Sequence, residues 1–511
     1  MTDSETSTTP EAPQTPSMLA SLLVVGVMIV LIVLSVIIFG SEVAEGPLQV
    51  SMTLATLFAL SVAYYYGFRG AVISDAIMNS VGGTIGTIYV LLAIGAIIGA
   101  LYLSGTVAAF VYYGVNLLSP RLFYVIVFAI ASVLALLLGS SLTAIGAVGV
   151  AFVGLATVMG VSPAIAAGAA VSGAVFGDKT AKISDTAILT IASVGGVTID
   201  EHAKMVMRTA IPVMIISALL FLVLGFTGSG GAAAADPADV QNVISQYFNV
   251  SLLAFLPVVL IFVLSALKFS AYLCLTIPAI VAVILAAFTQ QPLIATLAND
   301  PSLSYFESVL KVGIDTFANG FHLNSGVEQL DQVFSGGGTA GMLTTIWLIL
   351  VAAAFGAVTD YTGMLNRIIT PVINRAKGPG GLRLVTVLTS LGLNTVAADP
   401  YISIVLTSRM FRDEYKKEQL PPVALSSAIA DSGTIFSGII PWNVNGALFA
   451  ATLGLGTISF APFTFVAYLS PIVTVIVGFI AYGKRKLPEG EDPNAVYGTE
   501  PAKLPAPQRT A

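Results

Sequence analysis

The chain alternates long apolar runs with short polar segments, the pattern of a polytopic helical membrane protein. A helix of about twenty residues crosses a bilayer core of about 30 Å. Apolar runs of this length predict spans at 18–40, 49–67, 84–104, 206–226, 250–267, 270–289, 338–358 and 462–482. Polar residues interrupt two further crossings, at 163–196 and 423–457. The pattern therefore predicts ten crossings, two of them broken.

Two pairs of apolar segments are too short, and too polar at their centres, to be independent crossings. The first pairs 122–138 with 141–160, and the second pairs 383–398 with 400–411. We predict that each pair is a re-entrant hairpin. The candidate tip residues are Ser140, Ser141, Thr143, Asn394 and Thr395. These side chains could cap helix ends or bind a ligand, and the sequence leaves both roles open.

The two halves of the chain resemble each other at an offset of 259 residues, which superposes 161–212 on 420–471 and Pro163 on Pro422. The polar interruption at 178–186 coincides with the one in the second half. Each half holds five crossings, and an odd number requires the halves to have opposite orientations. We therefore predict an all-α polytopic membrane protein of two inverted repeats, each with a re-entrant hairpin and a broken transmembrane helix. This is an architecture of secondary transporters.

Charge placement orients the chain. The loop 41–49 is acidic, whereas lysine and arginine gather at Arg69, 204–208, 367–383, 409–417 and 484–486, which the positive-inside rule places in the cytoplasm. Both termini are therefore predicted to be cytoplasmic, in the cell (inner) membrane. The predicted organisation is a disordered cytoplasmic tail at 1–17, a first transmembrane repeat at 18–226, an extracytoplasmic linker at 227–249, a second transmembrane repeat at 250–483 and a cytoplasmic tail at 484–511.

Composition narrows the function. Of 511 residues, 56% are hydrophobic and 9% charged, against roughly 25% charged in soluble domains, which excludes a soluble enzyme. The net charge of −6 argues against a nucleic-acid partner. A single cysteine, Cys274, permits no intrachain disulfide. His202 and His322 lie too far apart in the sequence to suggest a metal site. We expect His202 in a solvated cytoplasmic turn, with pH sensing as the alternative role.

The first interruption brings four ionisable residues to membrane depth: Asp178, Lys179, Lys182 and Asp185. Each would cost about 2.5–3.5 kcal/mol at the centre of a lipid-facing helix, so all four must face protein or a water-filled cavity. Their charges sum to zero, and a purely structural ion-pair network is one reading. The functional reading makes Lys179 and Lys182 counter-ions to the acids or anchors for an anionic substrate.

Unwound helix ends and oxygen-bearing side chains suit a hard cation such as sodium. The candidate ion- or proton-binding residues are Asp178, Ser184, Asp185, Thr186, Asp431, Ser437, Asn443 and Asn445, with sodium as the metal at these oxygens. The amides could instead satisfy freed backbone groups, and Asp431 could be a buried acid satisfied by hydroxyls. Asp399, which precedes Pro400, is expected to be a helix N-cap rather than a proton carrier.

The interrupted segments resemble the NhaC family of sodium/proton antiporters, within the ion-transporter superfamily. Three motifs occur in the family's order: Gly177-Asp178-Lys179 with Ser184-Asp185-Thr186, the run from Asp399 to Lys417, and Asp431-Ser432-Gly433-Thr434 with Ile440-Pro441-Trp442-Asn443 and Gly446. The resemblance covers about residues 80 to 480. The chain departs from the family pattern at Leu142, Lys182, Ala187, Ile188 and Ala430.

The resemblance implies exchange of sodium, or a similar monovalent cation, for protons by alternating access. Relatives that exchange malate and lactate imply the alternative, a sodium- or proton-coupled carrier of a small organic acid or amino acid. A membrane enzyme has little support, because we find no nucleophile–base pair or nucleotide motif in the sequence. A channel explains the repeat less well than a carrier. The expected partners are the lipid bilayer, sodium ions and protons, with an organic anion and a second copy of the chain as further candidates, and no cofactor.

Overall fold

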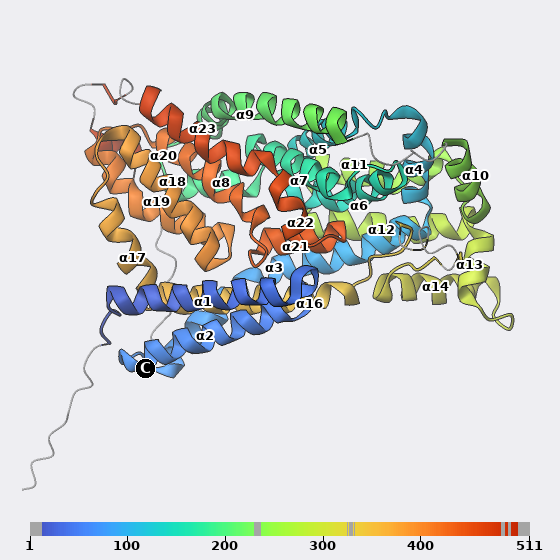
Figure 1. Cartoon of the computed structure of the whole chain (residues 1–511), viewed down its shortest axis with the longest axis horizontal. Coiled ribbons are helices and arrows are strands. Elements are labelled where there is room, and N and C mark those ends of the chain that lie inside the picture. Colours follow the sequence, from blue (N-terminus) through green and yellow to red (C-terminus); the bar gives the residue numbers. More distant parts are fainter. Residues whose placement is uncertain are drawn as a thin grey trace, which may run out of the picture.

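The computed structural model describes residues 13–481 apart from 229–236, 324, 327–330 and 332, together with 486–488 and 492–498. Over these ranges the chain is helical, and an isolated β-bridge joins Phe321 and Gly336. Among the described residues, seven helices are long and apolar enough to cross a membrane, or up to ten if each bent helix pair forms one span. Most helices run along the long axis of the molecule (Figure 1). The predicted all-α polytopic membrane fold is confirmed.

The first half of the chain contains the helices α1 Met18–Phe39, α2 Pro47–Tyr65, α3 Gly70–Leu103, α4 Thr106–Leu117, α5 Phe123–Leu138, α6 Ser141–Val158, α7 Pro163–Thr180, α8 Asp185–Val194 and α9 Ile199–Gly228. A 3₁₀ turn, η1 Gly40–Glu45, follows α1. Helix α3 begins at Gly70, well before the predicted span at 84–104. The prediction began too late because polar residues between 70 and 84 lower the hydropathy of this first part of the helix. Helix α6 is long and apolar enough to span by itself, and its re-entrant character stays a prediction.

The second half contains α10 Pro237–Tyr247, α11 Leu256–Ala266, α12 Ala271–Thr289, α13 Gln291–Ala298, α14 Tyr305–Asn319, α16 Leu343–Tyr361, α17 Met364–Ile373, α18 Gly378–Ala397, α19 Pro400–Lys417, α20 Pro422–Ile429, α21 Val444–Leu453, α22 Thr457–Phe460, α23 Phe465–Ala481 and α24 Pro493–Tyr497. A π-helical turn, η4 Ala430–Thr434, and a 3₁₀ turn, η5 Phe436–Ile439, continue α20. Helix α10 falls within the predicted linker 227–249.

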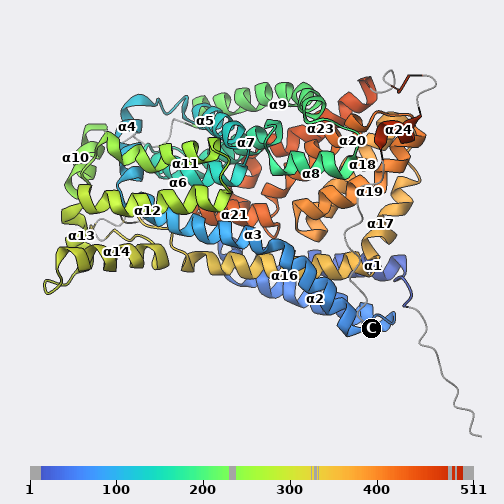
Figure 2. The ribbon, with the colours of Figure 1, turned by 180° about the vertical axis from the view of Figure 1, so that it is seen from behind.

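Helices α1, α2, α3 and α16 form one group, and α14 continues the line of α16 along α3 (Figure 2). The chain before α16 approaches α3 backbone to backbone, and the amide of Gly338 donates to the carbonyl of Gly95 at 2.7 Å. Gly337 has φ +79°, and a Cβ there would overlap the backbone of Gly99. Small residues on both sides therefore make this seam between the halves possible.

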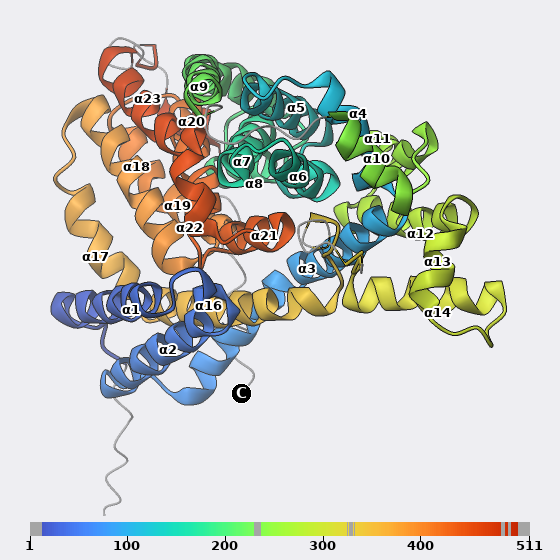
Figure 3. The same ribbon diagram turned by 45° about the vertical axis from the view of Figure 1, so that its right-hand side comes forward.

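A second group gathers the hairpins and the broken helices, with α18, α19, α20, α23 and α9 side by side (Figure 3). The element bounds in this group follow the predicted 259-residue offset. Helix α6 maps onto α19, and α8 maps onto α21, residue for residue at both ends. Helix α7 maps onto 422–439, the run formed by α20, η4 and η5. The lengths of repeated elements thus agree with the offset, while the opposite orientation of the two halves stays a prediction.

The hairpin turns also correspond. Gly139 ends α5 with φ +66°, and Ala398 ends α18 with φ +57°, a left-handed conformation that is uncommon for alanine. The next residues, Ser140 and Asp399, cap the following helices through their side chains, so the predicted N-cap role of Asp399 is confirmed. The second tip is therefore at 398–399. Asn394 and Thr395, predicted at this tip, instead lie in the last turn of α18.

Residues near the end of the chain pack against the second group. The Tyr497 ring is fully buried, and its hydroxyl donates to the carbonyl of Leu420 at 2.9 Å. The Arg412 guanidinium donates to the carbonyls of Tyr497 at 2.7 Å and Gly498 at 3.0 Å. Part of the predicted tail 484–511 is thus folded. Residues 1–12 of the predicted tail 1–17, and 499–511, lie outside the described residues.

Candidate ion- and proton-binding site

The first break holds a carboxylate between three donors. Helix α7 ends at Thr180 and α8 begins at Asp185, which leaves Asp178 in the last turn of α7. Asp178 Oδ2 accepts from the Ser141 amide at 3.1 Å and the Ser141 hydroxyl at 2.7 Å, and Oδ1 accepts from the Ser184 hydroxyl at 2.5 Å. The Thr186 hydroxyl lies 2.9 Å from Ser184 Oγ. The structure thus brings the first hairpin tip and the first break together around one acid.

The second break holds a corresponding cluster of polar side chains, all of them uncharged. At the 259-residue offset, Ser437, Asn443 and Asn445 occupy the places of Asp178, Ser184 and Thr186. The Asn445 side-chain amide donates to Ser437 Oγ at 2.9 Å, and the Asn445 backbone amide donates to Asn443 Oδ1 at 3.1 Å. Corresponding positions therefore make polar clusters in both halves. The acid is in the first cluster alone.

The second hairpin braces the second break. Asn443 Nδ2 donates to the carbonyl of Asn394 at 3.0 Å, and Trp442 Nε1 donates to the carbonyl of Thr395 at 2.7 Å. Asn394 Nδ2 in turn donates to the carbonyl of Gly433 at 2.7 Å. Asn394 and Thr395 are thus joined to the break by hydrogen bonds, although they are not at the hairpin tip.

A buried ion pair crosses from one half to the other. Lys179 Nζ contacts Asp431 Oδ1, and these two side chains are 1% and 0% exposed. Lys179 also donates to Ser470 Oγ at 2.6 Å, and the Thr209 hydroxyl donates to Asp431 Oδ1 at 3.1 Å. A buried lysine and a buried aspartate each need a partner of opposite charge. The pair therefore fixes the last turn of α7 against η4.

Arg383 extends this pair. The sequence places Arg383 in a basic cluster on the cytoplasmic side and at the start of the apolar segment 383–398; in the structure it lies in the second turn of α18 and is 2% exposed. Its guanidinium lies 3.9 Å from Asp431 Oδ2 and donates to the Ala424 carbonyl at 2.9 Å, the Ser427 hydroxyl at 3.0 Å and the Thr474 carbonyl at 2.9 Å. One acid thus faces two cations, which leaves this cluster with a net positive charge.

Lys182 does not belong to the buried site. Its ammonium pairs with Asp200 at 2.6 Å, and both side chains are 62% exposed. The neutral ion-pair network, which was one reading of Asp178, Lys179, Lys182 and Asp185, is therefore wrong, because Lys179 is buried and pairs with Asp431 while Lys182 is exposed and pairs with Asp200. Asp185 is exposed at the start of α8.

We predict that Lys182→Ala leaves ion exchange and thermal stability close to those of the unmodified protein. An exposed ion pair contributes little, because water screens both charges. The measurement is sodium-driven proton flux in liposomes together with thermal unfolding in detergent. A loss of flux in a folded variant contradicts this prediction and restores a substrate-anchor role for Lys182.

The second hairpin turn leads into a helix beside the first break. Tyr401 is in the first turn of α19, and α19 packs against α8, the helix that begins at Asp185. Asp399 accepts from the backbone amides of Tyr401 at 2.7 Å and Ile402 at 3.1 Å. Helix α19 from the second half therefore lies beside the helix that follows the first break.

His202 is buried, contrary to the solvated turn that we expected. It lies on α9 with 1% exposure, and its Nδ1 is 3.1 Å from the Ser426 hydroxyl on α20. The prediction was wrong because the acidic neighbours Asp200 and Glu201 face water, while His202 faces the opposite side of the same helical turn.

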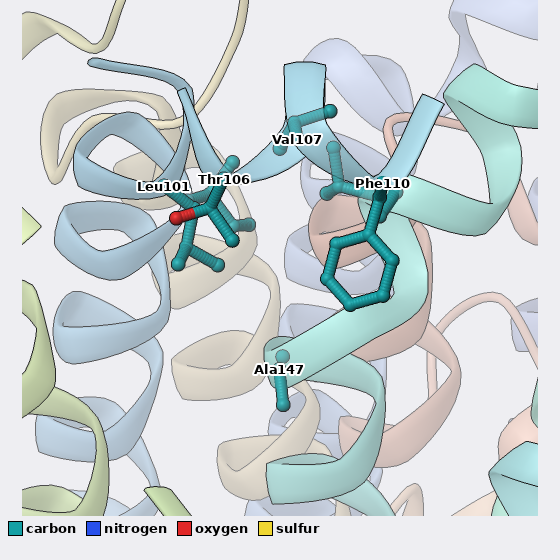
Figure 4. Close-up of a pocket in the computed structure, with 9 residues that line it drawn as sticks. Leu101, Thr106, Val107, Phe110 and Ala147 are labelled. Atoms are coloured by element: carbon teal, nitrogen blue, oxygen red, sulfur yellow. The ribbon is translucent and has the colours of Figure 1, made fainter. Parts of the chain in front are cut away.

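One cavity lies away from the breaks and another borders the second break. A pocket of about 10 Å³ between α3, α4 and α6 is lined by Leu101, Thr106, Val107, Phe110 and Ala147 (Figure 4). It is apolar except for the Thr106 hydroxyl, which donates to the Ala254 carbonyl at 2.6 Å, so it offers little to a cation. A cavity of about 780 Å³ between η1, α2, α16 and α21 includes Glu45, Gln49 and Pro441 in its wall. Pro441 belongs to the second break, which this cavity therefore borders.

Sequence reasoning missed Thr209, Arg383, Tyr401, Ser470 and Thr474. Hydroxyl residues are common in membrane helices, and Thr209, Ser470 and Thr474 gave no local signal. Arg383 did give a local signal, because it begins the apolar run 383–398. Tyr401 lies within the second family-like motif, which the residues alone did not connect to the first break.

The fold and the site together define a polytopic membrane transporter built around broken helices. The sequence profile of the Na+/H+ antiporter family matches residues 173–483. The chain belongs to this family.

Individual relatives agree with the family match. The chain is 31% identical over 443 residues to the Na(+)/H(+) antiporter NhaC of Alkalihalophilus pseudofirmus, a match that covers 86% of this chain and 91% of the relative. It is 30% identical to the Na(+)/H(+) antiporter NhaC of Bacillus subtilis, over 84% and 92% of the two chains. It is 27% identical to the Malate-2H(+)/Na(+)-lactate antiporter of Bacillus subtilis, over 87% and 92%.

Proposed function

We propose that this protein exchanges sodium ions for protons across the cell (inner) membrane by alternating access, with Asp178 as the central carboxylate. The observation that carries the proposal is the setting of Asp178, a partly exposed acid in a helix break that accepts from Ser141 and Ser184. Among the described residues it makes no salt bridge, so its negative charge is available to a cation.

Sodium and protons compete for this carboxylate. An ionised Asp178, with hydroxyl oxygens of Ser184 and Thr186 nearby, supplies the oxygen ligands that a hard cation needs. Protonation removes the negative charge and turns one carboxyl oxygen into a donor. A bound sodium ion is then released, so that the carboxylate carries either ion but not both.

Exchange further requires that the site faces each side of the membrane in turn. We infer that the second group, which holds the hairpins and the broken helices, moves against the group of α1, α2, α3 and α16. The latter group is closely packed, because the backbone at Gly338 donates directly to the backbone of α3 at Gly95. The positive-inside count supports a cytoplasmic location for both termini.

Exchange of organic acids is the second candidate function, on the basis of the malate and lactate antiporter among the relatives. An anionic substrate needs an available cation. Lys179 is occupied by Asp431 and Ser470, and Lys182 is exposed and paired with Asp200. These contacts favour the cation exchanger.

The test uses purified protein in liposomes that contain a pH-sensitive dye and an acidic lumen. We expect an external pulse of sodium to raise the internal pH, and we use lithium, potassium, malate and lactate as comparison pulses. A dye response to the organic acids without a response to sodium alone overturns the proposal. Liposomes without protein control for leakage.

A further inference from the structure

The cavity of about 780 Å³ between η1, α2, α16 and α21 borders a face of α21 that carries only small side chains. Its lining residues here are at positions i, i+3, i+4 and i+7: Ala447, Ala450, Ala451 and Gly454. Residues with this spacing share one face of a helix. No side chain on this face is larger than a methyl group, so α21 leaves room beside its neighbour α16 (Figure 3).

Helix α16 and the turn before it contribute a second face, which carries hydroxyl groups. Its lining residues have the same spacing: Gly341, Thr344, Thr345 and Leu348. Gln49 of α2 also belongs to the wall and is 0% exposed, and its Nε2 donates to the carbonyls of Ala44 at 2.8 Å and Thr344 at 3.0 Å. Its Oε1 is buried and has no hydrogen-bond partner among the described residues. A buried acceptor of this kind is suited to water or an ion.

The wall of this cavity carries a negative charge. Glu45 is the single ionisable residue among the described residues that line it, and its side chain is exposed. In the part of the chain that the structure describes, Glu45 makes no salt bridge. A cleft with one sign of charge and apolar walls focuses the field of that charge and raises the local concentration of counter-ions. The cavity therefore favours a cation over an anion.

The cavity extends from the end of α21 to the second break. Gly454, just after α21, and Pro441, inside the break, both belong to its wall. The 10 residues of α21 lie between them and rise about 15 Å, which is about half the thickness of a bilayer core. The cavity therefore joins a helix end to the break at membrane depth.

The charge pattern of the sequence predicts the side on which the cavity opens. The spans predicted at 338–358 and 462–482 run towards the basic segments 367–383 and 484–486, so the positive-inside rule places their first residues outside. The acidic loop 41–49 is predicted to lie on the same side. The wall includes residues from all three of these ends. Three segments far apart in the sequence therefore predict one mouth, on the extracytoplasmic side.

We propose that this cavity is the extracytoplasmic entry route of the transported cation, and that Glu45 draws the cation into it. The cation passes the hydroxyl groups of Thr344 and Thr345 and reaches the second break at Pro441. Helices α2 and α16 belong to one group and α21 to the other, so movement between the groups changes the width of this route. The inference rests on the proposed exchange and adds a path by which its cation arrives.

Cysteine accessibility tests the route, because the single native cysteine, Cys274, can be replaced by serine. In this background Ala447→Cys and Ala450→Cys are each exposed, in right-side-out membrane vesicles, to external membrane-impermeant methanethiosulfonates. We expect both cysteines to react. Relative to their rates with a free thiol, the cationic trimethylammonium reagent should react roughly tenfold faster than the anionic sulfonate, because one charge about 6 Å away contributes about threefold in water to each reagent, in opposite directions.

Thr452→Cys is the matched control for labelling, since Thr452 lies on α21 with 2% exposure and outside the cavity wall, and it should not react. Adding Glu45→Gln should remove the preference for the cationic reagent. In the same vesicles Glu45→Gln should raise the external sodium concentration at half-maximal exchange about threefold at low ionic strength and leave the maximal rate unchanged. Glu42→Gln is its matched control, because Glu42 is exposed on the same turn but outside the wall.

The entry route is overturned if neither folded cysteine variant reacts with the charged reagents. It is also overturned if both react only with an uncharged, membrane-permeant maleimide, which would show that lipid fills the cavity. Equal corrected rates for the cationic and anionic reagents contradict the role of Glu45. The labelling rates do not depend on ion flux. If the unmodified protein shows no sodium-driven flux, the proposed function therefore fails, and the labelling still decides whether the cavity admits cations.

Discussion

Asp431→Asn is expected to lower the free energy of unfolding by about 3–5 kcal/mol, the cost of leaving one member of a buried ion pair without its partner. The variant leaves Lys179 with neutral acceptors, the Ser470 hydroxyl and the new amide oxygen, and it removes the charge that faces Arg383 at 3.9 Å. Two buried cations then lose the carboxylate that they share. Thermal or denaturant unfolding of the purified protein in detergent measures the change.

Lys179→Met should cost less than Asp431→Asn, because Asp431 keeps the Arg383 guanidinium and the Thr209 hydroxyl. The double variant Lys179→Met with Asp431→Asn should regain part of the stability lost by Asp431→Asn, since it removes the unpaired lysine. Equal stability for Asp431→Asn and the unmodified protein contradicts a stabilising pair. Additive losses in the double variant contradict direct coupling between the two residues.

Asp178→Asn is expected to abolish sodium/proton exchange while the protein stays folded and inserted. The amide has the size of the carboxyl group and still accepts from Ser141 or Ser184, but it has no charge and does not titrate. A unit charge about 4 Å from a sodium ion contributes about 4 kcal/mol at an effective dielectric constant of about 20. Loss of this term weakens sodium binding by about a thousandfold. Dye flux and labelled-sodium uptake in liposomes measure the two halves of the exchange.

Asp200→Asn is the matched control for Asp178→Asn, because Asp200 is an exposed aspartate on the neighbouring helix. We expect its exchange to remain close to that of the unmodified protein. Wild-type exchange by a well-folded Asp178→Asn protein would show that the central carboxylate lies elsewhere, and Asp431 is then the candidate to test.

The sequence predicts the repeated elements well because their boundaries depend on local signals. Prolines at 163 and 422 begin the broken helices, and polar residues mark both interruptions. The left-handed turn at Ala398 gave no such signal, because alanine rarely adopts that conformation. The second tip was therefore placed at Asn394 and Thr395, where the polar side chains suggested it.

Contacts between the halves could not be predicted from local pattern. Lys179 and Asp431 are 252 residues apart, and nothing in the neighbourhood of either residue identifies the other. The four charges of the first break were read as one neutral set because they are adjacent in sequence. The helix end at Thr180 separates them instead, so that Lys179 and Lys182 point to different partners.

The buried position of Tyr497 has a consequence for the order in which the protein folds as it is made. Tyr497 follows every candidate membrane span in the chain, yet it completes an apolar cluster with Val194, Phe411 and Leu420. Chains fold from the N-terminus during synthesis. All the spans can therefore be in the bilayer while this cluster is still open, and the nascent protein carries an uncovered apolar surface until residue 497 has left the ribosome.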